Sequence, residues 1–63
     1  MKFTVTLILE IDDETVREAD AANLQLPKPA RTEEVIEDAI RAVITDNLPE
    51  YAKLESCICT REL

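Results

Sequence analysis

Apolar and polar residues alternate along the N-terminal segment 2–11. Every second position is apolar, and we call this set the odd row: Phe3, Val5, Leu7, Leu9 and Ile11. The positions between them form the even row, which is polar except for one residue: Lys2, Thr4, Thr6, Ile8 and Glu10. Because successive strand side chains point to opposite faces, this period of two predicts a β-strand with one face in the core. Ile8 is explained either by a single exposed apolar residue or by a partner that covers the polar face.

Two helices are predicted in the middle of the chain. Acidic residues at 12–14 suit a helix start, and residues 14–22 carry a thin apolar face. Thr32 is the expected cap of a second helix over residues 33–46. The apolar positions of this second helix form one wide face: Val35, Ile36, Ala39, Ile40, Val43 and Ile44. Asn23 and Asn47 are the expected left-handed residues where the two helices end.

The C-terminal residues 54–61 are compatible with a second strand, although their facing is ambiguous. The predicted fold is a single α+β domain over 1–63 with β-α-α-β order. Both terminal strands share one sheet, the helices pack on one face of it, and helix 33–46 covers the odd row. Two strands make a small sheet. Either the proline-containing connector 24–30 adds a short third strand, or two chains join their sheet edges in a homodimer, which we favour.

Charge restricts the kinds of partner. The chain has 63 residues, with 14 acidic against 7 basic side chains and a formal net charge of −7. Such a surface repels phosphates and anionic lipids, so we expect no direct nucleic-acid or membrane binding. A partner guided by charge would be basic, although the charge also serves solubility alone. The N-terminal apolar run is interrupted by polar residues and shows no secretory signal, so we expect a cytoplasmic protein.

Missing residue types restrict the chemistry. The sequence contains no His and no Gly. A His-based proton shuttle and a glycine-rich phosphate loop are therefore both excluded. Ser56 has no His to activate it, and so short a chain offers little scaffold for a preorganised pocket. We expect a non-enzymatic protein without a cofactor.

Cys57 and Cys59 are the most chemically suggestive pair. In a strand their side chains would share a face with Cα atoms about 7 Å apart, longer than a relaxed disulfide accepts. Zinc would need about two further ligands, which only a symmetric dimer with four thiols could supply. We favour two small buried apolar residues and no metal, and keep a thiol or metal module as an alternative.

A stripe of acids on the outer face of helix 33–46 is the second candidate site. It consists of Glu34, Glu37 and Asp38. Glu34 and Asp38 stand four residues apart, a mildly destabilising like-charge spacing in a helix. The stripe is either a solvated face or a charged surface presented to a basic partner.

These features predict a small acidic protein–protein interaction module that self-associates through a sheet edge. The expected interaction residues are Ile8, Glu34, Glu37 and Asp38. One alternative is an acidic nucleic-acid mimic that inhibits a basic nucleic-acid-binding protein. The other is the Cys57/Cys59 thiol or metal module.

Overall fold

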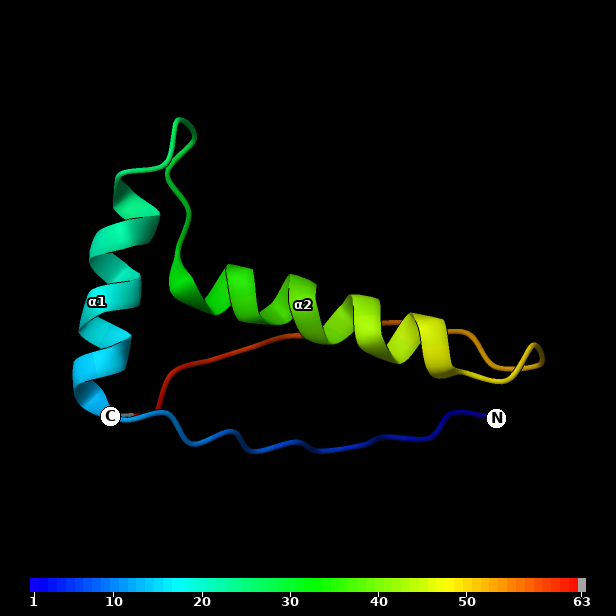
Figure 1. The fold of residues 1–63 in the computed structure, drawn as a ribbon. Helices are drawn as coiled ribbons and strands as arrows, with labels where there is room; N and C mark the ends of the chain where they lie inside the picture. Colours follow the sequence, from blue (N-terminus) through cyan, green and yellow to red (C-terminus); the bar gives the residue numbers. More distant parts are fainter. Residues whose placement is uncertain (63) are drawn as a thin grey trace.

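The computed structural model describes residues 1–62 and contains two helices and no strand within that range. Helix α1 spans Asp13–Leu24 and helix α2 spans Thr32–Asn47. The N-terminal segment 1–11 runs as an extended trace below α2, and the C-terminal segment 54–62 runs as an extended trace that passes behind α2 (Figure 1). α1 stands at one end of α2, and the Cα trace measures 40 × 27 × 15 Å.

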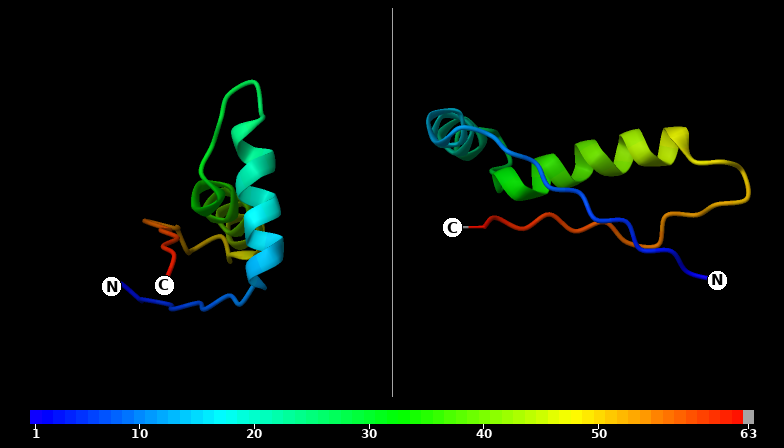
Figure 2. Two further views of the ribbon diagram at one scale, coloured as in Figure 1. Left: turned by 90° about the vertical axis from the view of Figure 1, so that its left-hand side faces the viewer. Right: turned by 90° about the horizontal axis from the view of Figure 1, so that it is seen from below.

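The predicted α+β fold with both terminal strands in one sheet is wrong. Within residues 1–62, no backbone hydrogen bond joins the N-terminal segment to the C-terminal one. The two segments run in the same direction, and seen from below they cross at an angle (Figure 2). Only a parallel ladder would fit that direction, and a two-stranded sheet is marginal in water even when antiparallel. The described chain is a small all-α protein with two extended terminal segments.

The predicted packing of helix 33–46 across the odd row is also wrong. Phe3 and Val5 are 85% and 79% exposed, and no apolar side chain in residues 1–62 is buried. The apolar face of α2 is covered in part but not fully buried at its most enclosed positions: Ile36, Ile40 and Ile44. The connector 24–30 forms a turn and bends at residues 25–28, and it adds no third strand.

Helix α1 begins where the acidic residues predict. The Asp12 carboxylate accepts hydrogen bonds from the Thr15 backbone amide at 2.9 Å and from the Thr15 hydroxyl at 2.7 Å. These bonds favour the charged form and lower the pKa of Asp12 below its ordinary value. The predicted helix 14–22 is confirmed and is slightly longer than expected. Asp12 is therefore a true N-cap.

The ends of the helices differ from the prediction in chemical detail. Thr32 is the first residue of α2 and not its cap; Arg31 occupies the cap position, and its side chain makes no capping hydrogen bond to the backbone of the helix. Asn23 and Asn47 both lie inside helices, and no residue in 1–62 has a positive φ. The side-chain amide of Asn47 instead donates through Nδ2 to the backbone carbonyl of Val43 at 2.7 Å. Within the described range, neither helix is long and apolar enough to cross a bilayer.

Candidate interaction surface

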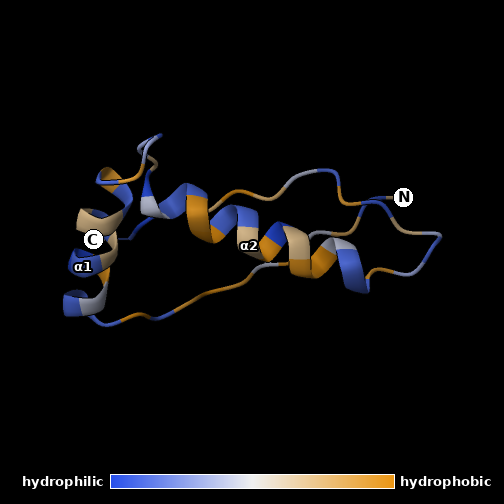
Figure 3. Cartoon of the chain, turned by 45° about the horizontal axis from the view of Figure 1, so that its top comes forward, coloured by the Kyte–Doolittle hydropathy of each residue, from blue (hydrophilic) through white to orange (hydrophobic). Residues whose placement is uncertain are grey.

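The N-terminal segment 1–11 presents its apolar side chains to solvent. Large apolar residues on both rows are exposed along its whole length: Met1, Phe3, Val5, Leu7, Ile8, Leu9 and Ile11. Figure 3 shows a long orange stretch along the lower trace that leads into α1, with blue close to the helix. Ile8, which the sequence marks as an interaction residue, is 84% exposed. Single exposed apolar residues are ordinary, but a contiguous series of them marks an interaction site.

The same segment leaves its backbone available. Within residues 1–62, no backbone–backbone hydrogen bond involves residues 1–11. Among the polar contacts within residues 1–62, an ion pair between Lys2 Nζ and Glu55 Oε1 at 2.9 Å ties the segment to the C-terminal part of the chain. Both side chains are largely exposed, and such surface pairs contribute little to stability. The segment is therefore an extended strand-like peptide with free backbone donors and acceptors, and its polar side-chain contact with the rest of residues 1–62 is one weak ion pair.

The C-terminal segment 54–62, in contrast, is fixed to both helices. Arg41 Nη2 donates to the Cys57 carbonyl at 2.9 Å, and the Cys59 amide donates to Glu37 Oε1 at 2.9 Å. Further along, Arg61 binds Asp20 of α1 through two hydrogen bonds of 3.0 and 3.1 Å. These hydrogen bonds occupy backbone and side-chain groups of the C-terminal segment within the same chain. The N-terminal segment has fewer such bonds, so more of its groups are available to a partner.

Five polar residues form a cluster that we call the Arg61 clamp: Asp20, Asn23, Thr32, Glu33 and Arg61. Arg61 Nη2 donates to Glu33 Oε1 at 2.8 Å in addition to its bonds with Asp20. The Thr32 hydroxyl donates to Asp20 Oδ1 at 2.6 Å and accepts from Asn23 Nδ2 at 3.0 Å. Thr32 is only 7% exposed and is the one buried residue within 1–62. The clamp joins α1, the start of α2 and the C-terminal segment.

Electrostatics within the clamp favours its charged state. Hydrogen bonds from Arg61, and then from Thr32, lower the pKa of the Asp20 carboxyl below its ordinary value. The same contact with Asp20 raises the pKa of Arg61. Asp20 and Arg61 were not predicted as site residues, because two residues that are 41 positions apart show no spacing signal in the sequence. Thr32 carried a signal, but it was interpreted as a helix cap.

The predicted acidic stripe is divided by contacts within the chain. Glu34 accepts from Arg31 at 3.0 Å, and Glu37 turns towards the C-terminal segment, where it accepts from the Cys59 amide. Arg41 also lies 3.8 Å from Glu37. Asp38 is exposed on the helix. Two of the three carboxylates thus have partners in this chain, which leaves less uncompensated charge for a basic surface.

The two cysteines do not form a disulfide and are half-buried. Cys57 Sγ lies 4.0 Å from the Glu37 carbonyl oxygen, a long and weak contact. Among the described residues, no group of three or more potential ligand side chains could hold a metal ion. The chain itself therefore supplies at most two thiolates at this place.

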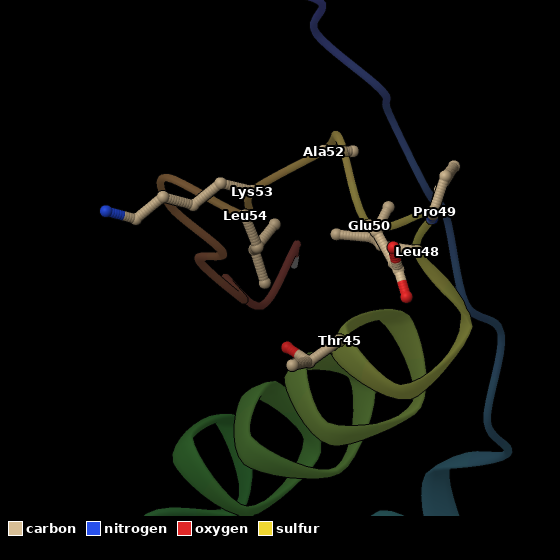
Figure 4. Close-up of a pocket in the computed structure, with 7 residues that line it drawn as sticks. All are labelled: Thr45, Leu48, Pro49, Glu50, Ala52, Lys53 and Leu54. Atoms are coloured by element: carbon tan, nitrogen blue, oxygen red, sulfur yellow. The ribbon is translucent and has the colours of Figure 1, made fainter.

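A hollow of about 350 Å³ lies at the turn after α2. Seven residues line it: Thr45, Leu48, Pro49, Glu50, Ala52, Lys53 and Leu54. Figure 4 shows the Lys53 side chain extending away from the other labelled side chains, while Leu54 points towards the end of α2. Ligand pockets combine apolar walls with several converging polar groups. Here the charged end of Lys53 points away, so the lining does not assemble such a group.

Comparisons of this chain with known protein families, with curated proteins and with solved structures find no match. The candidate surface is therefore defined by its own geometry. It consists of the N-terminal segment 1–11, with exposed apolar side chains on both rows and an available backbone.

Proposed function

We propose that this chain is a non-enzymatic protein–protein interaction module that self-associates through its N-terminal segment. The observation that carries the proposal is the exposure of the odd row along a segment whose backbone makes no backbone hydrogen bond within residues 1–62. Because the fold contains no sheet there, the edge that associates is the extended segment itself. The expected cytoplasmic location stays a prediction.

Two physical effects support association at this segment. An extended chain with free amides and carbonyls is a template for pairing with another chain. Burial of a Val, Leu, Ile or Phe side chain contributes about 1.5 to 3 kcal/mol, and the odd row holds several that are exposed. Ordering and association oppose these gains, so only part of them becomes affinity.

The two alternatives have less support. A nucleic-acid mimic needs a dense array of free negative charge, but Glu34 and Glu37 accept hydrogen bonds from Arg31 and Cys59 of the same chain. A metal module at Cys57 and Cys59 would need ligands from another chain, because the described residues supply no third ligand. Self-association through residues 1–11 uses backbone amides and carbonyls that make no backbone hydrogen bond within residues 1–62.

Sedimentation equilibrium of the full chain tests the proposal. At tens of micromolar and roughly physiological ionic strength we expect the mass of two chains. Val5→Asp places a charge in the odd row and is expected to reduce the mass to that of one chain. Ile58→Asp is the matched control, since Ile58 has the same exposure of 79% but lies in the C-terminal segment.

The outcomes separate clearly. A dimer that Val5→Asp dissociates and Ile58→Asp leaves intact supports the proposal. A monomeric wild-type chain at these concentrations contradicts it. Equal dissociation by both variants contradicts it as well, because the interface would then extend beyond the N-terminal segment.

A further inference from the structure

We propose that two copies of the chain pair residues 2–10 as antiparallel strands about a two-fold axis at Thr6. This inference rests on the proposed function and adds the partner, direction and register. In this register, residue numbers facing each other add up to twelve. Each side chain then faces one of its own row, so the apolar odd row is continuous across both copies.

Charge complementarity selects this arrangement over a parallel one. Lys2 and Glu10 lie at opposite ends of the even row, and they face each other in both halves of the antiparallel pair. A parallel pair in register would place Lys2 against Lys2 and Glu10 against Glu10. Opposite charges facing each other across strands are favourable, whereas like charges are destabilising. The sequence is thus self-complementary in one direction only.

The structure also favours this register over its neighbours. In the register where facing residue numbers add up to fourteen, Lys2 of one copy would face Asp12 of the other. The Asp12 carboxylate, however, already caps α1 through Thr15. In the register where facing residue numbers add up to ten, Glu10 has no facing residue in the other copy. The register about Thr6 alone pairs both charges while α1 keeps its cap.

Lys2 is accessible for this exchange. In the single chain its ammonium group contacts Glu55, and both side chains are largely exposed. Such a contact is weak and exchanges readily. Ile8, on the even row, would face Thr4 of the other copy, which places its exposed side chain inside the contact.

A cysteine at the proposed axis tests the register directly. In a background with Cys57→Ser and Cys59→Ser, Thr6→Cys brings two thiols together, because facing Cα atoms lie about 4.5 to 5.5 Å apart. Thr4→Cys is the matched control on the same row. Its two copies would lie roughly 14 Å apart along the strands, at about 3.4 Å per residue. After mild oxidation we expect a covalent dimer with Thr6→Cys and none with Thr4→Cys.

Charge exchange provides a second measurement. Lys2→Glu alone is expected to raise the dimer dissociation constant about tenfold, since two attractive contacts become repulsive. Adding Glu10→Lys in the same chain restores the wild-type constant. Glu55→Gln is the control, because it removes the contact within the chain and should not weaken the dimer. A parallel dimer would not be weakened by Lys2→Glu.

The results distinguish the two levels of inference. Equal cross-linking by Thr4→Cys and Thr6→Cys, or no rescue by the charge exchange, overturns the register. If Val5→Asp still dissociates the dimer in that case, the proposed function stands with a different pairing. A wild-type chain that is monomeric throughout removes both.

Discussion

At the scale of single residues, the Asp20 carboxyl is a group whose pKa is shifted by its contacts in the fold. It accepts two bonds from Arg61 and one from Thr32, and these bonds hold its pKa below the ordinary value of 3.8. A carboxyl with a lower pKa in the folded chain stabilises the fold when it is ionised. That contribution is fully present above the unfolded pKa and is lost as the pH falls through the folded pKa.

Acid titration of stability therefore reports on the Arg61 clamp. We expect the midpoint temperature of thermal unfolding of the wild-type chain to decrease as the pH is lowered from about 5 to about 2. Asp20→Asn should lower the midpoint near neutral pH and make the acid dependence shallower, since the variant has no proton to bind at this position. Circular dichroism of both chains across this pH range measures the difference.

Glu18→Gln is the control for this titration, because Glu18 is exposed on the same helix. It should retain the wild-type acid dependence. If Asp20→Asn and wild type lose stability with the same slope, the Asp20–Arg61 contact does not contribute to the stability of the fold.

At the scale of elements, local patterns predicted the helices and failed for the strands. The apolar spacing of α2 and the acids before α1 act within a few residues, so both helices were predictable. The alternation of apolar and polar residues over 2–11 predicted a β-strand with one face in the core, and this prediction is wrong. The segment is extended, but a strand exists only when a second segment supplies a ladder. That partner is a tertiary property, and within residues 1–62 none pairs with it.

In the candidate site, too, residues that depend on local spacing were identified from the sequence, and contacts that depend on the tertiary arrangement were not. Ile8 was identified from the sequence because it interrupts a local alternation, and the structure leaves it exposed. Glu37 was assigned to an outward stripe from helical geometry alone. Its contact with the Cys59 amide depends on where the C-terminal segment lies, which no spacing reveals. Arg61 was missed for the same reason, since its partners come from both helices.

The Thr32 hydroxyl at the start of α2 forms hydrogen bonds with Asp20 and Asn23 of α1 and so joins the two helices. Thr32→Val leaves the shape nearly unchanged but removes the donor to Asp20 and the acceptor for Asn23. Because one bond is to a charged group, we expect a loss of about 1 to 3 kcal/mol in the free energy of unfolding. Denaturant titration measures this loss.

Two matched variants calibrate the measurement. Thr32→Ser keeps the hydroxyl and should lose clearly less than Thr32→Val. Thr45→Val makes the same change at an exposed position of α2 and should stay within about 0.5 kcal/mol of wild type. Equal effects of Thr32→Val and Thr32→Ser would assign the role of Thr32 to packing and not to its hydrogen bonds.

At the scale of the whole molecule, the chain exposes the apolar residues that a small domain ordinarily buries. No apolar side chain is buried within residues 1–62, and one exposed ion pair joins the N-terminal segment to the C-terminal one. Small chains without disulfides commonly gain stability from oligomerisation. The net charge of −7 on each copy opposes association at low ionic strength, and salt weakens that repulsion.

Thermal stability should consequently depend on protein concentration. If folding and association are linked, a tenfold increase above the dissociation constant adds about 1.4 kcal/mol and raises the midpoint by several degrees. Val5→Asp should make the midpoint independent of concentration, whereas Ile58→Asp should keep the wild-type dependence. Calorimetry over a hundredfold dilution series, roughly physiological in ionic strength, provides the comparison. A wild-type midpoint that stays constant over the series would mean that one chain folds alone, and the exposed odd row would then contribute nothing to stability through a second copy.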